Sequence, residues 1–232
     1  MGKRTTGRAK GKGSFTFQVR KKAYVYRISY PRISVEGKAR VERLINSLAH
    51  TSPLAKISIN NEQFYVPACD GIYEGQEIML GGNDVKNGNI LKLKDIPQGT
   101  NIFNIEVFPG SGGKLIRCSG TSGTIGTRDD KRVEVIIKRR RLMLNSECRA
   151  IIGVVSGSGR TSKPLVKAGK QHHRMLSRGK KWHRTSPIKT NALDHPFGGG
   201  RGKRIKSKIA QRNAPPGAKV GHIRPRRTGY VK

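Results

Sequence analysis

The chain has 232 residues, and its 48 Lys and Arg against 14 Asp and Glu give a formal net charge of +34. A chain this cationic repels itself unless a polyanion neutralises it, so nucleic acid is the expected partner and an anionic membrane is the weaker option. No apolar run is long enough for a transmembrane helix and no signal-peptide pattern is present, so we expect no membrane partner. The three cysteines are widely spaced and odd in number, which disfavours a disulfide framework and favours a reducing compartment such as the cytoplasm.

The charge is distributed unevenly along the chain. Residues 1–22 carry eight basic and no acidic residues, whereas residues 23–110 carry nine of each. Residues 111–170 carry fourteen basic and four acidic residues, and residues 171–232 carry seventeen and one. This pattern predicts a neutral folded module, a second module with a basic face, and two cationic tails. The tails are poor in apolar residues, so we expect them to become ordered only on a partner.

The N-terminal part of the sequence predicts a basic extension followed by a small β-barrel. Residues 1–14 form the extension, for which nucleic-acid contact is favoured over a merely solubilising role. Strand-like alternation of apolar residues recurs within residues 15–86, and residues 41–45 suit either a strand or a helix face. The strand segments are residues 15–19, 23–28, 55–59, 63–67 and 77–80. Asn60-Asn61-Glu62 is a predicted hairpin turn. Frequent turns and short strands favour a barrel over a helical fold.

Phe64 and Tyr65 lie in one of these predicted strands. Neighbouring aromatic residues can stack on bases, as they do in oligonucleotide-binding barrels. Aromatic residues in strands are more often part of the core, and we favour that interpretation here.

A second barrel of five or six strands is predicted over residues 87–170. Its strand segments are residues 90–93, 104–108, 114–118, 133–137, 142–144 and 150–155. Residues 109–113 and 119–123 are short Gly-rich connections between them. Arg117 and the run Lys138-Arg139-Arg140-Arg141 mark the basic face of this barrel. The sequence leaves open whether that run contacts RNA or forms a solvated turn.

Regular structure is expected to fade after Gly157, and residues 171–232 read as an extended basic tail. Trp182, the only tryptophan, lies among basic residues. It either stacks on a base or pins the tail to the second barrel, and the second role is slightly preferred.

One stretch of the tail, residues 191–204, cannot form a regular element. Pro196 disfavours a helix at His195 and has no backbone donor. Three consecutive glycines, residues 198–200, allow backbone to pass where no side chain fits. The basic residues Arg201, Lys203 and Arg204 follow. The stretch therefore predicts irregular backbone lying close to a negative partner, with a flexible linker as the alternative.

Several kinds of chemistry are disfavoured by the sequence. His172, His173 and His183 lack the spacing and the neighbouring ligands of a zinc site, so we expect no metal and no cofactor. Asp194 and His195 with a serine could be imagined as a triad, but no Gly-x-Ser-x-Gly elbow is present, and triads are recognised by geometry. A histidine can act as a general acid or base, but for His195 holding an RNA phosphate or a backbone oxygen is the favoured role.

Many short motifs occur in one order along the chain. They are Gly88-Asn89-Ile90-Leu91-Lys92-Leu93, Ile96-Pro97-Gln98-Gly99-Thr100, Asn104-Ile105-Glu106, Pro109-Gly110, Gly112-Gly113-Lys114-Leu115-Ile116-Arg117, Glu147-Cys148-Arg149-Ala150, Lys163-Pro164, Lys167-Ala168-Gly169-Lys170, Asn191-Ala192-Leu193-Asp194-His195-Pro196-Phe197-Gly198-Gly199-Gly200, Arg212-Asn213-Ala214-Pro215-Pro216-Gly217-Ala218-Lys219-Val220-Gly221-His222-Ile223 and Arg226-Arg227-Thr228-Gly229. With these motifs the chain resembles ribosomal protein 2 of the large subunit, a universal family, and specifically its archaeal-type members.

The resemblance implies a mainly β fold. An oligonucleotide-binding-like barrel (residues 15–86) would be followed by an SH3-like barrel (residues 87–170), with basic tails at residues 1–14 and 171–232. It also implies a non-enzymatic, structural constituent of the large subunit that binds ribosomal RNA and supports subunit association, tRNA placement and the architecture around the peptidyl transferase centre. The expected partners are large-subunit RNA, small-subunit RNA at an intersubunit bridge and neighbouring ribosomal proteins, with the chain as a monomer in the ribosome.

The family's contribution to peptide-bond formation is contested, so the resemblance implies RNA contact rather than catalysis for His195. The predicted RNA-binding residues are Arg117, Lys138, Arg139, Arg140, Arg141, Arg184, His195, Gly198, Gly199, Gly200, Arg201, Lys203, Arg204, Arg212, Lys219, Arg226 and Arg227. The chain departs from the family pattern at residues 46–52, where an Asp-Pro-Gly-Arg-like turn is usual, and at residues 138–141, where a Pro-Ser-Gly turn is usual.

Two alternatives from other classes make different predictions. An RNA-directed hydrolase or transferase using His195 and Asp194 would lose turnover in a His195→Ala variant while still binding RNA. A DNA-compacting protein would bind duplex DNA of any sequence equally well, and the neutral module disfavours it.

Overall fold

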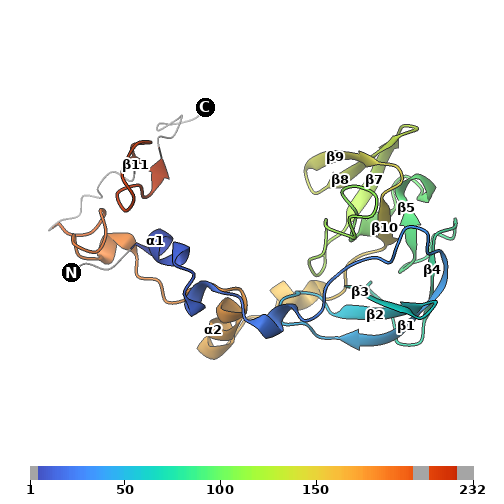
Figure 1. Ribbon diagram of the computed structural model, residues 1–232, viewed down its shortest axis with the longest axis horizontal. Helices are drawn as coiled ribbons and strands as arrows, with labels where there is room; N and C mark the ends of the chain where they lie inside the picture. Colours follow the sequence, from blue (N-terminus) through green and yellow to red (C-terminus); the bar gives the residue numbers. More distant parts are fainter. Residues whose placement is uncertain (1–4, 201–208, 224–232) are drawn as a thin grey trace. The chain divides into compact units, whose positions relative to one another are not determined.

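The computed structural model describes residues 5–200 and 209–223 (Figure 1). The chain divides into two compact units, which are described separately. We call residues 21–166 the body, and residues 1–20 together with 167–232 the tail unit. In the described part of the chain, no helix combines the length and the apolar character needed to cross a membrane.

The body is built from ten strands in one continuous sheet, ordered β3-β2-β1-β4-β5-β10-β6-β7-β8-β9. Their bounds are β1 Gly37–Ile45, β2 Leu54–Ile59, β3 Glu62–Pro67, β4 Glu77–Leu80, β5 Ile90–Lys92, β6 Asn101–Phe103, β7 Gly123–Arg128, β8 Arg132–Ile137, β9 Arg140–Asn145 and β10 Arg149–Ile152. All neighbours pair antiparallel except β4 and β5, which pair parallel. The predicted mainly β class is therefore confirmed, with an oligonucleotide-binding-like group of strands followed by an SH3-like group.

The β2–β3 hairpin forms where the sequence predicted it. Its two-residue turn is Asn60-Asn61, with φ values of 45° and 64°. Asparagine tolerates this left-handed backbone better than most residues, and such turns match the twist of the flanking strands. Residues 41–45, which the sequence left ambiguous, belong to strand β1.

Two hydrophobic cores share one wall. Along β5, β6 and β10, successive side chains point to opposite faces, as the two-residue repeat of a strand requires. Ile90, Phe103 and Ile151 therefore enter the first core, whereas the residues next to them enter the second. Phe64 is 4% exposed in the first core, so its predicted core role is confirmed. Tyr65 is half-buried, with its ring centre 5.1 Å from that of Tyr26.

A buried ion pair connects separate segments of the body. Glu106 Oε1 accepts hydrogen bonds from Arg149 Nη2 and from the backbone N–H of Gly112, both at 3.0 Å. Arg149 Nη1 also donates to the carbonyl of Pro31 at 2.9 Å, and the guanidinium lies 5.0 Å from the centre of the Tyr30 ring. Glu106 is 0% exposed and Arg149 7% exposed, so each charge depends on the other for compensation.

The N-terminal strand predictions were wrong. Phe15–Phe17 and Lys21–Tyr24 are short 3₁₀ helices, η1 and η2, and within residues 23–28 only Ile28 forms a β-bridge. The apolar alternation there does not mark a buried face, because Phe15 is 91% exposed and Val25 64% exposed.

Two strand predictions in the second barrel were also wrong in position or extent. The strand near residues 104–108 lies earlier, at β6, and ends where Asn104 turns to φ 50°. Within residues 114–118 only Leu115 forms a bridge, because Ile116 has φ 52° and breaks the extended backbone. Strand β7, at Gly123–Arg128, was missed because its glycines resemble a connection. A Cβ on Gly126 would lie 2.4 Å from Glu134 Oε2 on β8, so a larger residue there would displace the end of the Glu134 side chain.

The tail unit contains more helix than the sequence predicted. Thr6–Gly11 forms α1 and Ala168–Ser177 forms α2, with 3₁₀ helices at Ser158–Thr161 (η4, in the body) and Pro187–Lys189 (η5). The expectation that regular structure fades after Gly157 was therefore wrong for α2. Further along the tail unit, β11 (Ile209–Ala210) pairs parallel with β12 (His222–Ile223). In the body, η3 (Leu93–Asp95) follows β5.

Thiol labelling is expected to separate the three cysteines. Cys118 is exposed, whereas Cys69 and Cys148 are buried. Burial raises the pKa of the Cys148 thiol to about 11, and it also raises that of Cys69. A disulfide reagent such as DTNB should therefore modify one thiol in the native protein at pH 8 and all three after denaturation. Two fast-reacting thiols in the native state would contradict this packing.

The same thiol gives a pH dependence with a defined sign. An unfolded cysteine releases its proton near pH 8.5, whereas folded Cys148 keeps it until about pH 11. The folded state then binds more protons, so this contribution to stability is lost as the pH rises from about 9 to 11.

Candidate nucleic-acid interface

The predicted basic run lies at the tip of the β8–β9 hairpin. Ile137 pairs with Arg140, so Lys138 and Arg139 form a two-residue turn. Lys138 has φ 56°, a left-handed conformation that a non-glycine residue rarely adopts. All four side chains of residues 138–141 are exposed, and Arg141 has an ion-pair partner, Glu134, at 3.5 Å.

Arg117 and Lys138 lie in one pocket of the body, although 21 positions separate them in sequence. This pocket has a volume of about 470 Å³ and also includes Tyr24 and His50. The other three members of the basic run do not line it. Neither Tyr24 nor His50 was predicted as a site residue. Tyr24 lies between Lys21-Lys22 and Tyr26-Arg27, which is the signal that could have indicated it, whereas His50 has no basic or aromatic neighbour in the chain.

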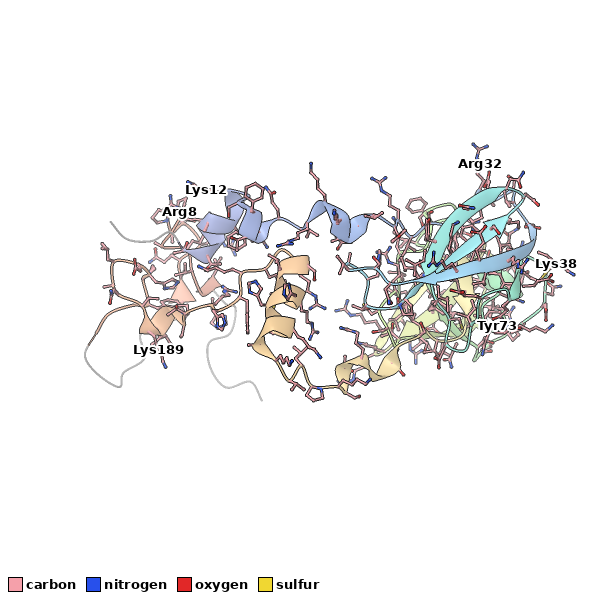
Figure 2. All side chains as sticks on the ribbon, turned by 90° about the horizontal axis from the view of Figure 1, so that it is seen from below. Arg8, Lys12, Arg32, Lys38, Tyr73 and Lys189 are labelled. Atoms are coloured by element: carbon pink, nitrogen blue, oxygen red, sulfur yellow. The ribbon has the colours of Figure 1, made fainter. Side chains whose placement is uncertain are left out.

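The tail unit contains a cleft of about 1000 Å³, which we call the tail cleft. Three separate segments contribute to it: residues 5–8, residues within 181–195, and residues within 216–221. The basic side chains among its lining residues are Arg8, Lys181, Arg184, Lys189 and Lys219. Asp194 is the acidic residue among the described lining residues, and His195 lines the cleft beside it. Figure 2 labels Arg8 and Lys189 on this unit.

Residues 190–199 form a compact reversal beside the cleft. The N–H of Gly198 donates to the carbonyl of His195 at 2.8 Å, and that of Gly199 donates to the carbonyl of Thr190 at 3.0 Å. A Cβ on Gly198 would lie 2.3 Å from the carbonyl oxygen of Asn191 and 2.5 Å from that of Thr190. Glycine is therefore required here by the packing of the chain against itself. The sequence predicted that these glycines allow close approach to a partner. At Gly198 it did not predict that the chain's own carbonyl groups already require glycine.

The next two glycines have left-handed backbone. Gly199 has φ 74° and Gly200 has φ 101°. A Cβ on Gly199 would lie 2.8 Å from the Cβ of Ala192. Both Gly199 and Gly200 are exposed, so their backbone is accessible to a partner.

The His195 ring has a defined orientation and tautomer. The backbone N–H of Phe197 donates to its Nδ1 at 3.1 Å, and the two rings pack edge to face with centres 5.0 Å apart. Because Nδ1 accepts, a neutral His195 carries its proton on Nε2, which can donate to a phosphate or carbonyl oxygen. The ring is half-buried.

The remaining predicted residues are distributed over the tail unit. Arg184 and Lys219 line the tail cleft, and Arg212 is exposed in a turn that does not line it. Arg201, Lys203, Arg204, Arg226 and Arg227 lie outside the described residues.

Trp182 lies in an aromatic cluster of the tail unit. Its ring centre is 3.9 Å from that of His183 and 6.3 Å from that of His172. His172 and His173 come from α2, and their rings are edge to face at 5.6 Å. Within residues 5–200 and 209–223, no group of three or more His, Cys, Asp or Glu side chains has the arrangement of a metal site.

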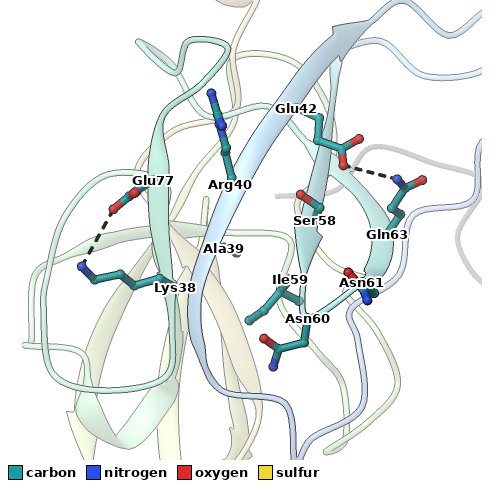
Figure 3. A pocket seen from close by; sticks show the side chains of 10 residues that line it. All are labelled: Lys38, Ala39, Arg40, Glu42, Ser58, Ile59, Asn60, Asn61, Gln63 and Glu77. Atoms are coloured by element: carbon teal, nitrogen blue, oxygen red, sulfur yellow. Dashed lines mark hydrogen bonds and ion pairs between the residues drawn. The ribbon is translucent and has the colours of Figure 1, made fainter.

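A polar groove of about 440 Å³, which was not predicted from the sequence, crosses β1, β2, β3 and β4 (Figure 3). Its charges are largely paired: Glu42 lies 2.6 Å from Lys56, and Lys38 lies 4.0 Å from Glu77. The hydrogen bond from Lys56 lowers the pKa of Glu42. Gln63 also donates to Glu42 at 3.3 Å. A surface neutralised in this way attracts a polyanion less than the tail cleft does.

The chain is similar in sequence to ribosomal proteins of the large subunit. A family model described as "Ribosomal Proteins L2, C-terminal domain" matches residues 86–217. A protein of Archaeoglobus fulgidus named "Large ribosomal subunit protein uL2" is 42% identical over 234 residues, which cover 99% of this chain and 99% of the relative. Proteins of the same name from Natronomonas pharaonis and Methanocaldococcus jannaschii are 40% and 39% identical. The first alignment covers 99% of this chain and 97% of the relative, and the second covers 100% of both.

Proposed function

Because the chain belongs to the uL2 family of large-subunit ribosomal proteins, in its archaeal type, we propose that it binds large-subunit ribosomal RNA directly, through the tail cleft and the basic face of the body. As a member of that family it is a structural component of the ribosome in the cytoplasm and not a conventional enzyme.

The observation that carries the proposal is the charge of the tail cleft. Five basic side chains from three segments converge there, with one acidic side chain among the described lining residues. Bringing these cations together is unfavourable without a polyanion, and RNA releases condensed counterions when its phosphates are neutralised.

The mode of recognition we propose is contact with shape and phosphate. Double-stranded RNA hides its bases in a narrow major groove, so a protein reads it mainly through the backbone. The exposed hairpin residues 138–141 suit phosphate contact, as do Arg184 and Lys219. The predicted residues outside the described part of the chain belong to the same proposal. His195 is proposed as an RNA contact, because its Nδ1 accepts the hydrogen bond from Phe197 and its Nε2–H can donate to RNA. The chemistry of peptide-bond formation is assigned to RNA and not to this residue.

The wider role we propose follows the family. The protein would support subunit association, tRNA placement and the architecture around the peptidyl transferase centre. Its partners would be large-subunit RNA, small-subunit RNA at an intersubunit bridge and neighbouring ribosomal proteins, with one copy in each subunit. The division into residues 1–14, 15–86, 87–170 and 171–232 also remains a proposal. The 86/87 boundary falls in the connection between β4 and β5.

Sedimentation of native extract tests the function. We expect the protein to migrate with large subunits in a sucrose gradient and to remain there after a high-salt wash. Simple counterion exchange predicts release by salt, because affinity falls steeply with ionic strength when phosphate contacts are the only attachment. Recovery of the protein at the top of the gradient, as free chain, would contradict the proposal and would direct attention to turnover by His195 and Asp194.

A further inference from the structure

The pocket around Arg117 combines basic side chains with aromatic and apolar ones, and neutralising a phosphate requires only the basic side chains. We call it the Arg117 pocket, and its volume is about 470 Å³. Three cations line it: Lys114, Arg117 and Lys138. The structure describes every residue that lines it, and none of these is acidic. The remaining wall is largely apolar or aromatic and includes Ile116 and Ile137.

Tyr24 and His50 form the aromatic part of this wall. Their ring centres are 5.9 Å apart at an angle of 84°, so the edge of one ring meets the face of the other. Tyr24 is 57% exposed, which leaves ring surface open to a ligand. His50 is fixed by a 2.8 Å hydrogen bond between its Nδ1 and Ser47 Oγ. Burial, and secondarily the charge of Arg117, lower the pKa of His50, so its ring is neutral near pH 7.

Two hydrogen bonds donated by backbone N–H groups hold three segments of the wall together. The N–H of Ala49 donates to the carbonyl of Ala23 at 3.2 Å, which places the segment of His50 beside that of Tyr24. The N–H of Ser119 donates to Thr51 Oγ1 at 3.0 Å, which joins the same segment to that of Arg117. The pocket is thus built by four parts of the body that are separated in sequence: residue 24, residues 49–51, residues within 114–122, and residues 137–138.

The backbone is strained at two positions in the pocket. Ile116 has φ 52° and Lys138 has φ 56°. A β-branched residue such as isoleucine is a marked exception in this region, and such a conformation persists only where surrounding packing imposes it. Ile116 packs against both hydrophobic cores. The packing that imposes this conformation also fixes the direction of the chain at Arg117, as expected of a preorganised binding site.

We propose that the Arg117 pocket binds one unstacked nucleotide of the RNA, with the base against the Tyr24–His50 pair and the phosphate on Arg117, Lys114 and Lys138. This inference rests on the proposed RNA-binding function and adds a base to what is otherwise phosphate contact. A π-face is common to every base, so the pocket accepts a splayed-out nucleotide without requiring one sequence.

Two RNA hairpins of equal length test the pocket with the full-length protein. One carries a single bulged adenosine, and the other carries an abasic site at the same position, so both present the same phosphates. Affinity is measured by fluorescence anisotropy at moderate salt with heparin as competitor. We expect the wild-type protein to bind the bulged hairpin about tenfold more tightly, as one stacked base gives. Tyr24→Ala should abolish this preference, whereas Tyr24→Phe should keep it.

Tyr73→Ala is the matched control, because Tyr73 is 64% exposed on the body and does not line the pocket (Figure 2). It should keep the tenfold preference. Arg117→Ala should weaken binding to both hairpins and make the salt slope shallower by about one phosphate contact.

Each failure has a distinct meaning. Equal wild-type affinity for the two hairpins would overturn the pocket and leave RNA binding intact. A preference that survives Tyr24→Ala would also overturn it, because the base would then bind elsewhere. Absence of binding to either hairpin would overturn the pocket together with the proposed function.

Discussion

Replacing Arg149 with alanine is expected to lower the free energy of unfolding of the body by about 3–5 kcal/mol. The substitution leaves the carboxylate of Glu106 fully buried without its counterion. It also removes the donors that bind the carbonyls of Pro31 and Arg32 at 2.9 and 3.4 Å. Because domains of this size are stable by only about 5–15 kcal/mol, the loss is a large share of the total. Urea denaturation of the full chain, followed by far-UV circular dichroism, measures it.

An exposed ion pair provides the control for this prediction. Lys94 bonds to Glu147 with side chains 47% and 45% exposed, so water screens the pair. Lys94→Ala should therefore leave the denaturation midpoint close to that of the wild type. The burial argument fails if Arg149→Ala and Lys94→Ala shift the midpoint equally. A second variant, Glu106→Gln, removes the charge but keeps the shape, and it should be less harmful than Glu106→Ala.

Gly198→Ala is expected to reduce incorporation of the protein into large subunits by about tenfold, the factor that corresponds to about 1.4 kcal/mol. The added Cβ would lie 2.3 and 2.5 Å from two carbonyl oxygens, so the reversal at residues 190–199 cannot close as it does now. His195 would then lose the orientation that its hydrogen bond from Phe197 provides. Co-expression of tagged variant and untagged wild type, with quantification of both in the large-subunit peak, measures the effect.

Gly169→Ala is the matched control, since it makes the same substitution within the tail unit. Gly169 lies in α2, and a Cβ there meets nothing within 4 Å. Alanine also favours a helix over glycine by about 1 kcal/mol, so incorporation should not fall. The urea midpoint of the body should stay unchanged in both variants. If Gly198→Ala incorporates as well as Gly169→Ala, the geometry of the reversal is not needed for assembly.

Local sequence patterns predicted the structure correctly where a residue type strongly favours one backbone conformation. The Asn60-Asn61 turn and strands β2 and β3 follow from asparagine's tolerance of left-handed backbone and from the two-residue apolar alternation. The same alternation wrongly predicted a strand at residues 15–19, where Phe15–Phe17 is a 3₁₀ helix. An alternating pattern does not show that a partner strand is present. Strand β7 shows the opposite error, since its glycines resemble a connection although Gly126 packs against the Glu134 side chain of the neighbouring strand.

The candidate site divides in the same way. The basic run at residues 138–141 and the His195 stretch are visible as composition, and the structure describes the run as exposed and His195 as half-buried. The Arg117 pocket is not visible in this way, because Tyr24 and His50 lie 26 positions apart in sequence and meet only when the body folds. The same holds for the tail cleft, to which three distant segments contribute.

The sequence by itself predicted a polyanionic partner, and it determined the mainly β class and the ribosomal family, because charge, periodicity and ordered motifs can all be read from the order of residues alone. Only the tertiary structure decided which residues share a site and which charges are compensated. Glu106 and Arg149 lie 43 positions apart in sequence. They form an ion pair only because folding brings Arg149, on β10, beside the loop of residues 106–112 that holds Glu106. Burial and proximity depend on contacts between distant segments, and those contacts exist only after folding.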